Sequence, residues 1–200
     1  YLTALEATLL AESADAAQKQ YEDLSRTDAL TRLPNRRHLS EQVETWLSDS
    51  RSIGLMMIDV DHFKFYNDSL GHPAGDACLQ KVSAALANAT DGLDDAFCAR
   101  FGGEEFSFVL RNASEMSAAS AAEAILQAVA DLQISHPSRP DRLGVVTVSI
   151  GIVVNCSNDP DVSFDHLIEF ADRALYVAKR HGRNTFSMDS ASGEAMRFCV

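Results

Sequence analysis

RFGGEEF, at residues 100–106, places two glycines and two acids between segments in which apolar residues recur at every second position. Those apolar residues are Phe97, Ala99 and Phe101 before the glycines and Phe106, Phe108 and Leu110 after them. Glycine readily adopts the positive φ of tight turns, so the pattern predicts a β-hairpin over about residues 96–111. Glu104 and Glu105 then lie at its tip, where two acids beside side-chain-free backbone suit a metal ion and a phosphate.

The composition of the 200 residues fits one folded domain with an appendage. Hydrophobic residues make up 46% of the chain, which is enough for a full core and argues against disorder. The net charge of -12, from 17 basic and 29 acidic residues, argues against a nucleic-acid partner, because such a partner needs a basic stripe. A nucleotide site stays compatible with this charge, since it needs only a few placed cations.

The four cysteines are predicted to be buried, reduced thiols, because they form no CxxC pair and no histidine lies at metal-finger spacing. They are Cys78, Cys98, Cys156 and Cys199. No apolar run approaches the roughly 20 residues of a membrane span, and no signal peptide is visible. These features predict a cytoplasmic protein, either free or as the cytoplasmic part of a membrane-anchored protein. The start at Tyr1, without methionine, indicates a fragment of a longer protein.

Residues 1–26 are predicted to be helical, because they contain no glycine or proline and are rich in alanine, glutamate and glutamine. A short heptad stripe runs along them: Leu10, Ala14, Ala17, Tyr21 and Leu24. The helix either lies on its own domain or forms a parallel coiled-coil stalk that joins two copies to an upstream module. We favour the stalk, although the stripe is shorter than three heptads.

The rest of the chain alternates between helical and strand patterns. Helices are predicted at residues 35–48, 73–89, 114–132 and 163–181, and strands besides the hairpin at 53–59, 143–154 and 184–187. This order predicts an α/β fold with one central, mixed, five-stranded sheet flanked by helices and preceded by the helical stalk.

Asp59 ends the apolar run of residues 53–59. Sites form at strand ends in open sheets, so Asp59 and Glu104 can face one ion if this strand lies beside the hairpin. Carboxylates select hard cations, and Mg²⁺ held by few protein ligands leaves room for substrate phosphates. The backbone N–H groups around His62 and Phe63 begin a short helix and can bind a phosphate.

The Asp-x-Asp pair at residues 59–61 is, on its own, more simply a polar loop. That interpretation weakens once Lys64, Asn67, His72 and Asp76 are included, because they add a phosphate-type cation and three groups able to bind a base edge.

Lys179 and Arg183 lie four residues apart near the end of a predicted helix and share a face if the last turn continues. Two cations there can clamp terminal phosphates, or they can simply complement the helix dipole. The sequence has no Walker A motif and no arrangement typical of a covalent nucleophile. Acids, cations and amides are the groups used in metal-assisted phosphoryl transfer.

These motifs resemble those of the GGDEF domains, the diguanylate cyclases. Four segments match in the family's order: residues 28–37, its first motif; 59–76, its metal and guanine segment; 102–106, its signature; and 171–184, its closing helix. The resemblance implies a nucleotidyl-cyclase-like palm over residues 27–187, with the helical stalk at 1–26 and a tail at 188–200.

The resemblance also implies roles for individual residues. Mg²⁺, with Mn²⁺ as an alternative, would be held by Asp59, the backbone carbonyl of Val60 and Glu104, with Glu105 assisting. Glu104 would also be the base for the attacking 3′-hydroxyl, with Glu105 as the second catalytic acid. The implied substrate contacts are Asn67 and Asp76 on guanine, with His72 nearby, and Lys64, Lys179, Arg183 and the amides near His62 and Phe63 on the triphosphate.

The family joins two GTP molecules into cyclic di-GMP and releases two pyrophosphates. Each domain brings one GTP, so the resemblance implies a homodimer whose active-site faces meet. A stalk would raise the effective concentration of one half-site near the other, and an upstream sensor could change its geometry.

One feature departs from the family. Many members carry an Arg-x-x-Asp product-binding site just before the hairpin, and this chain has Leu93-Asp94-Asp95-Ala96 at that offset. The bidentate arginine is missing, so we predict no strong product inhibition through this site. Product binding elsewhere, through Arg139 or Arg142, stays open.

Three hypotheses for function remain. The first is an active diguanylate cyclase. The second is a catalytically silent module that binds GTP or cyclic di-GMP, although such modules usually lose a hairpin glycine or acid and this chain has lost neither. The third is a cyclase that makes a mixed or adenine dinucleotide. Asp76 argues against it, because a carboxylate suits the N1–H and amino donors of guanine.

Overall fold

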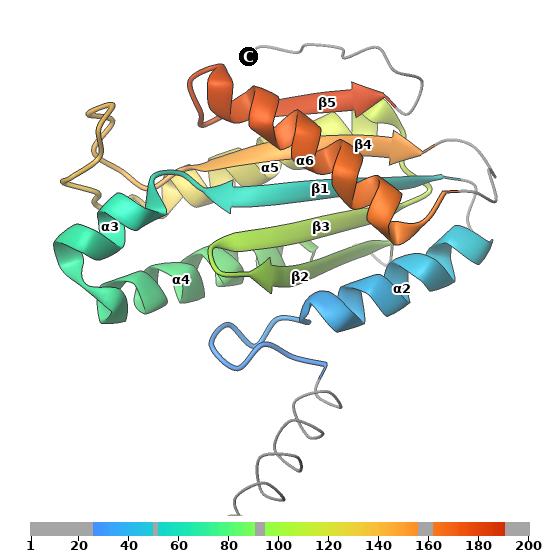
Figure 1. The fold of residues 1–200 in the computed structure, drawn as a ribbon, viewed down its shortest axis with the longest axis horizontal. Helices are drawn as coiled ribbons and strands as arrows, with labels where there is room; N and C mark the ends of the chain where they lie inside the picture. Colours follow the sequence, from blue (N-terminus) through green and yellow to red (C-terminus); the bar gives the residue numbers. More distant parts are fainter. Residues whose placement is uncertain (1–25, 50–51, 91–94, 156–161, 191–200) are drawn as a thin grey trace, which may run out of the picture.

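A computed structural model describes residues 26–49, 52–90, 95–155 and 162–190 (Figure 1). A five-stranded sheet lies at its centre, in the order β2-β3-β1-β4-β5. The strands are β1 (Ile53–Val60), β2 (Ala96–Gly102), β3 (Glu105–Arg111), β4 (Val148–Asn155) and β5 (Phe186–Ser190). Only the β4–β5 pair of this sheet is parallel, so the mixed sheet predicted from the sequence is confirmed.

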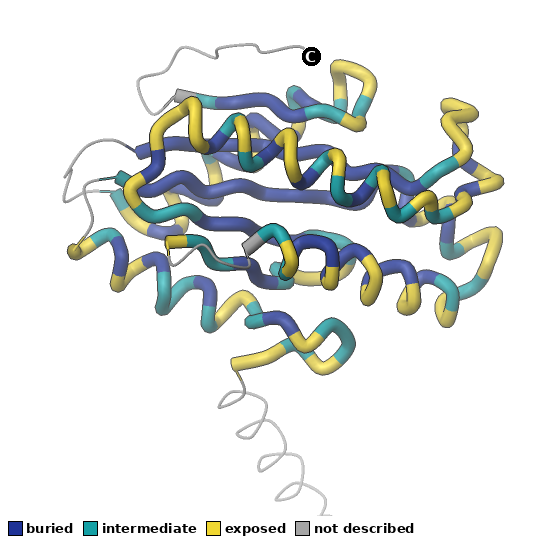
Figure 2. Tube along the Cα trace, turned by 180° about the vertical axis from the view of Figure 1, so that it is seen from behind, coloured by how far each residue is buried: buried dark blue, intermediate teal, exposed yellow. Residues whose placement is uncertain are grey.

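Helices cover both faces of the sheet. One face carries α2 (Arg36–Asp49) and α6 (Phe164–Arg180), and the other carries α4 (His72–Thr90) and α5 (Glu115–Asp131) (Figure 1). The short α3 (Phe63–Leu70) follows β1 and leads into α4. The central strands β1 and β4 are buried at every position, as the dark tube in Figure 2 shows.

The core divides into two clusters, one on each side of the sheet. Met56, Ile58 and Phe106 belong to the cluster beneath α4 and α5. Leu55 and Met57 belong to the cluster beneath α2 and α6. Side chains alternate along a strand, so Asp59 lies on the same side as Leu55 and Met57. The acid at the end of β1 therefore faces α6.

Gly151 allows α6 to lie directly on β4. A Cβ atom at this position would lie 2.1 Å from the carbonyl oxygen of Ala171 and 2.2 Å from the backbone nitrogen of Leu175. No side chain fits between the strand and the helix. The position of α6, and with it the position of Lys179, is therefore set by backbone packing.

Two strand predictions were wrong at their ends. The strand expected at residues 143–154 begins only at Val148, because the preceding residues form a loop whose Val145 carbonyl is bound by the buried Arg139. The last strand, expected at 184–187, begins at Phe186 and runs to Ser190, because Met188 packs into the core. The other predicted helices and strands of the described residues are confirmed to within about two residues.

The helical stalk predicted at residues 1–26 lies outside the described residues except for Arg26, and so do Leu93, Asp94, Cys156 and Cys199. Cys78 and Cys98 are buried free thiols, as predicted. Burial raises their thiol pKa values to about 11 and about 12. None of the helices in the described ranges is both long and apolar enough to span a membrane.

Candidate active site

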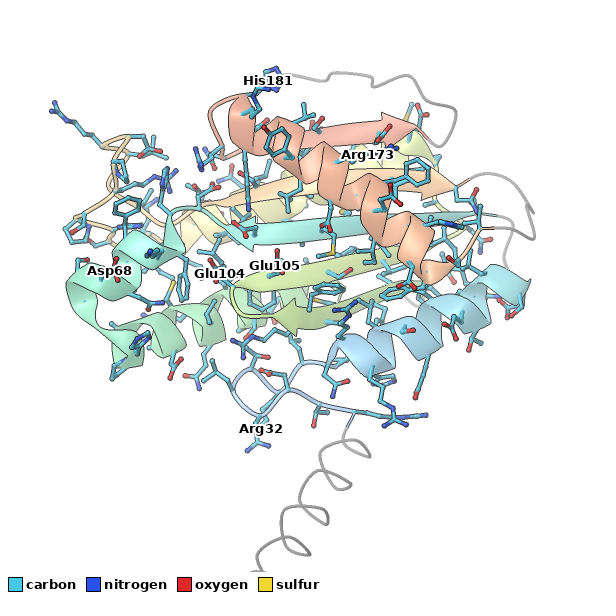
Figure 3. All side chains as sticks on the ribbon, viewed as in Figure 1. Arg32, Asp68, Glu104, Glu105, Arg173 and His181 are labelled. Atoms are coloured by element: carbon cyan, nitrogen blue, oxygen red, sulfur yellow. The ribbon has the colours of Figure 1, made fainter. Side chains whose placement is uncertain are left out.

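The end of β1 lies beside the hairpin tip, as the sequence analysis required for a shared site. Asp59 pairs with Glu105 in the antiparallel β1–β3 register. The backbone N–H of Val60 donates to the carbonyl oxygen of Glu104 at 3.3 Å. Glu104 and Glu105 lie next to each other at the tip (Figure 3). Three acids from two distant segments therefore meet at one end of the sheet.

Lys179 of α6 neutralises the innermost of these acids. Its Nζ lies 2.9 Å from Oδ2 of Asp59. Burial raises the pKa of Asp59, and the lysine only partly offsets that effect. Burial, and then the negative charges of Asp59 and Asp172, raise the pKa of Glu105. The acids repel one another, and an added cation would relieve the repulsion.

The acids at this end of the sheet can supply some, but not all, of the ligands of a divalent cation. Within the described ranges, no group of three or more histidine, cysteine or acidic side chains is arranged to hold a metal ion by itself. The candidate ligands are Asp59, Glu104, Glu105 and the carbonyl of Val60. Such a set leaves coordination positions for phosphate oxygens and water, which is the arrangement that Mg²⁺ prefers.

Arg100 clamps the hairpin tip, a role that sequence reasoning missed. Its Nε and Nη2 donate to the carbonyl oxygen of Gly103 at 3.1 and 2.6 Å, and Gly103 has a φ of 54°. Its Nη1 lies 2.9 Å from Oδ1 of Asp28. Although burial raises it, hydrogen bonds from Thr31 and Arg100 hold the pKa of Asp28 below its usual range. Asp28 and Arg100 both lie in motifs identified from the sequence, but 72 residues separate them, so no local pattern indicated their contact.

The candidate guanine residues lie on α3 and at the start of α4. Asn67 Oδ1 is buried and has no hydrogen-bond partner among the described residues. It lies against Gly75, where a Cβ atom would be 1.9 Å away. His72, the first residue of α4, and Asp76, in its second turn, are both exposed. Asn67 Oδ1 is thus a hydrogen-bond acceptor that no described residue satisfies. Gly75 is a further residue that sequence reasoning missed.

The candidate phosphate residues come from two segments. His62 has a left-handed φ of 59° and precedes α3, whose first residue, Phe63, is buried. Lys64 follows and is exposed. Burial, and then the positive charge of Arg183, lower the pKa of His62. The backbone N–H of Asn184 also donates to Oδ2 of Asp61, the residue before His62, at 3.0 Å. This bond brings the turn after α6 close to the start of α3.

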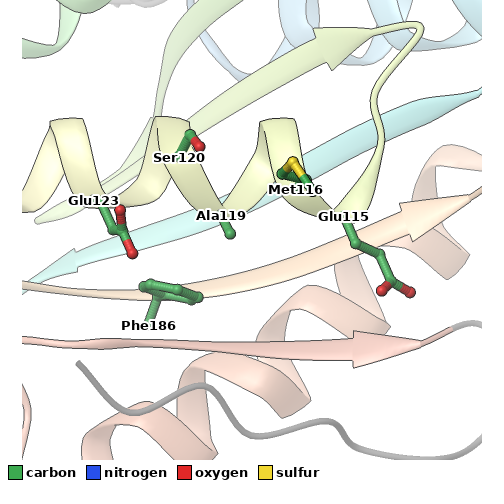
Figure 4. A pocket seen from close by; sticks show the side chains of 6 residues that line it. All are labelled: Glu115, Met116, Ala119, Ser120, Glu123 and Phe186. Carbon is green, nitrogen blue, oxygen red and sulfur yellow. The ribbon is translucent and has the colours of Figure 1, made fainter.

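The residues considered for product binding outside the hairpin differ in exposure. Arg139 is buried and donates to Asp141 Oδ1 at 2.7 Å and Thr147 Oγ1 at 2.7 Å, so it cannot reach a ligand. Arg142 is exposed. A pocket of about 390 Å³ between α5 and β5 lies on the sheet face opposite Asp59 (Figure 4). Its lining includes none of the site residues: Glu115, Met116, Ala119, Ser120, Glu123 and Phe186.

Related proteins carry the same domain. The family model for the diguanylate cyclase GGDEF domain matches residues 25–185. Diguanylate cyclase DosC from Escherichia coli K12 is 37% identical over 180 residues, which cover 86% of this chain and 38% of DosC. Cyclic di-GMP phosphodiesterase PdeR from the same organism is 32% identical over 174 residues, covering 85% of this chain and 25% of PdeR. The chain thus spans less than half of either relative.

A solved structure has the same fold. The coiled coil and GGDEF domain of DgcB from Caulobacter crescentus, in complex with c-di-GMP, superposes with a TM-score of 0.71 at 30% identity. The superposition covers 94% of this chain and 99% of that one. Fold, motif order and family model agree, and this chain belongs to the GGDEF domain family of diguanylate cyclases.

Proposed function

We propose that the chain is a diguanylate cyclase that condenses two GTP molecules into cyclic di-GMP and releases two pyrophosphates. The observation that carries the proposal is the meeting of Asp59, Glu104 and Glu105 at one end of the sheet, with Lys179 bound to Asp59. This group combines ligands for a cation with a counter-charge for phosphate, which phosphoryl transfer requires. The similar proteins named diguanylate cyclases support it.

Asp59, the Val60 carbonyl and Glu104 would hold Mg²⁺ or Mn²⁺, with Glu105 assisting. When bound, the ion would neutralise charge on the reacting phosphoryl group. Glu104 would accept the proton of the attacking 3′-hydroxyl, since the hairpin tip places it beside the end of β1, where Val60 N–H donates to its carbonyl oxygen. Arg100 keeps the tip in place during this step.

Asn67 and Asp76 would bind guanine, with His72 nearby. Lys64, Arg183, Lys179 and the amides at His62 and Phe63 would hold the triphosphate. Attack by one GTP on the other requires a second copy of the domain, so the active form would be a homodimer. Residues 1–26 would act as the stalk that aligns the two copies under the control of an upstream sensor, with the cyclase domain in the cytoplasm.

A silent GTP-binding or cyclic di-GMP-binding module is the second candidate. PdeR, which is named a phosphodiesterase, shows that similar sequence occurs in proteins named for another activity. The retained glycines and acids of the hairpin favour the cyclase.

The test is turnover of GTP with Mg²⁺, followed as pyrophosphate and dinucleotide. Glu104→Ala should lower the rate at least about 100-fold, the loss typical of a general base. The matched control is Glu169→Ala, an exposed acid near the start of α6, which should keep the wild-type rate. GTP binding without turnover at high protein concentration would instead support the silent module. Equal rates with ATP would contradict the assignment of Asn67 and Asp76 to guanine.

A further inference from the structure

Asp61 lies two residues after Asp59, but its carboxylate is fully buried and faces only protein donors. Ser149 Oγ donates to Oδ1 at 2.6 Å. Thr147 Oγ1 and the backbone N–H of Asn184 donate to Oδ2 at 2.7 and 3.0 Å. Both oxygens are satisfied, so Asp61 does not share a metal with Asp59 despite the Asp-x-Asp spacing.

Arg139 packs beside this buried carboxylate and hydrogen-bonds one of its donors, Thr147. Its Nη2 lies 3.9 Å from Oδ2 of Asp61, and its Nη1 donates to Thr147 Oγ1 at 2.7 Å. Its Nε donates to Asp141, whose other oxygen lies 3.5 Å from Nε2 of His62. The contacts therefore run from the end of β1, through the start of β4, to the residue that precedes α3.

The Asn184 N–H belongs to an unusual turn after α6. Gly182, Arg183 and Asn184 have φ values of 108°, 65° and 48°, three positive values in a row. Residues with side chains adopt this region uncommonly, asparagine more readily than arginine, and neighbouring contacts stabilise them there. The hydrogen bond from Asn184 to Asp61 is such a contact, and it links positions 123 residues apart.

We infer that Asp61 is a positioning residue for the triphosphate: it holds the turn that carries Arg183 against the beginning of α3. The inference rests on the proposed function, in which Arg183 and the amides at His62 and Phe63 contact the phosphates. Asp61 itself touches no substrate. Its carboxylate acts by fixing one backbone N–H, next to the arginine, to the end of the strand that carries Asp59.

The test is a double-mutant cycle with Asp61→Ala and Arg183→Ala in the 200-residue chain. The probe is guanosine 5′-(α,β-methylene)triphosphate with Mg²⁺, whose blocked α,β bridge prevents turnover, and the measured quantity is its Kd. Asp61→Ala should raise the Kd about tenfold in the wild-type background. In the Arg183→Ala background the same change should raise the Kd less than about twofold. Asp61→Asn retains an oxygen acceptor for the Asn184 N–H, so it should restore binding to within about threefold of wild type.

Asp189 provides the matched control. It is a mostly buried acid paired with an arginine, because Arg173 Nη2 lies 3.1 Å from its Oδ2, and it is in β5 at the other end of the sheet. Asp189→Asn should lower the Tm without changing the Kd. If Asp61→Ala does not fold, Thr147→Val replaces it in the cycle, because valine keeps the shape and removes one donor to Asp61.

The outcomes separate the two claims. If the Asp61 variants weaken binding equally with and without Arg183, or not at all, Asp61 does not act through Arg183 and the inference is overturned. If Arg183→Ala itself leaves the Kd unchanged, the proposed role of Arg183 in binding triphosphate is wrong, and the inference falls with it.

Discussion

Gly75 is the residue on which the candidate guanine site depends most directly. A Cβ atom there would lie 1.9 Å from Oδ1 of Asn67 and 3.2 Å from Cζ of Phe63. We therefore expect Gly75→Ala to displace the Asn67 side chain and to weaken GTP binding about tenfold, as expected when a buried acceptor is misplaced. The measurement is Kd for GTP and for ATP, because the preference for GTP should fall as well.

The same substitution should stabilise α4, because alanine is favoured over glycine by about 1 kcal/mol inside a helix. Thermal unfolding will separate the two effects. The control is the same substitution in an Asn67→Ala background, where Gly75→Ala should cost no further affinity. A full tenfold loss in that background would show that the glycine is required for another reason.

Glu105 should lower the free energy of unfolding by an amount that depends on pH. Burial, and then the charges of Asp59 and Asp172, raise its pKa above the usual value of 4.5. The folded-state pKa lies above the unfolded one, so the ionised carboxylate destabilises the fold above the raised pKa, and this cost disappears below about 4.5.

Glu105→Gln should therefore raise the Tm at neutral pH in the absence of divalent cations, and the gain should shrink as the pH falls toward about 4.5. Mn²⁺ should narrow the difference in Tm, because it should stabilise the wild type more than a variant that lacks one assisting carboxylate. The measurement is the Tm of both proteins across this pH range. A gain that is independent of pH, or one shared by the exposed Glu169→Gln, would contradict this explanation.

The hairpin depends on the clamp formed by Asp28, Arg100 and Gly103. Without Arg100, the Gly103 carbonyl loses two donors and Asp28 loses its ion-pair partner. We expect Arg100→Ala to lower kcat about tenfold through loss of order at the tip, with a smaller change in the Kd for GTP. Steady-state kinetics and direct GTP binding measure the two quantities.

Arg111 is the matched control, because it forms an ion pair with Asp49 at 3.1 Å at the other end of β3. Arg111→Ala should leave kcat unchanged. The kcat of Asp28→Asn should lie between those of Arg100→Ala and Arg111→Ala, because this change removes the ion pair and leaves the bonds from Arg100 to Gly103. An Arg100 variant whose affinity falls as much as its kcat would indicate that the clamp shapes the substrate site rather than the tip.

The hairpin and most helices were predictable because their signals are local. Alternating apolar residues around two glycines predict the hairpin, and helical periodicity predicts α5 and α6. The start of β4 was not predictable, because the β-branched residues just before it form a loop held by the buried Arg139. Arginine is usually exposed, so nothing in the local pattern indicated its burial.

Activity of the whole molecule should depend on protein concentration, because each domain would supply half of an active site. Specific activity should rise with concentration, and a chain that starts at Ser25 should be much less active than the 200-residue chain when dilute. At high concentration the two should converge. The measurement is initial rate against concentration for both chains, with sedimentation for the oligomeric state. Equal rates and equal dimerisation at every concentration would rule out the stalk as the dimerising element.

Apart from the neighbourhood of Asp59 and Glu104, the candidate site was predictable only as a list of residues. Its motifs identified Asp59, Glu104, Lys179 and Arg183, but their contacts join positions far apart in the sequence. Asp28 with Arg100 and Asp61 with Asn184 are pairs that no spacing rule indicates. Such pairs depend on the order of strands in the sheet and on how α6 packs against it. Both are properties of the tertiary structure.

The bond between Asp61 and Asn184 has a consequence for how the protein is made. Synthesis runs from the N-terminus, so the acids and the hairpin leave the ribosome well before the turn that carries the candidate phosphate residue Arg183. β5, the last described strand, pairs only with β4 and follows that turn directly. A nascent chain therefore lacks the turn that completes the candidate site until almost all of residues 26–190 have been translated.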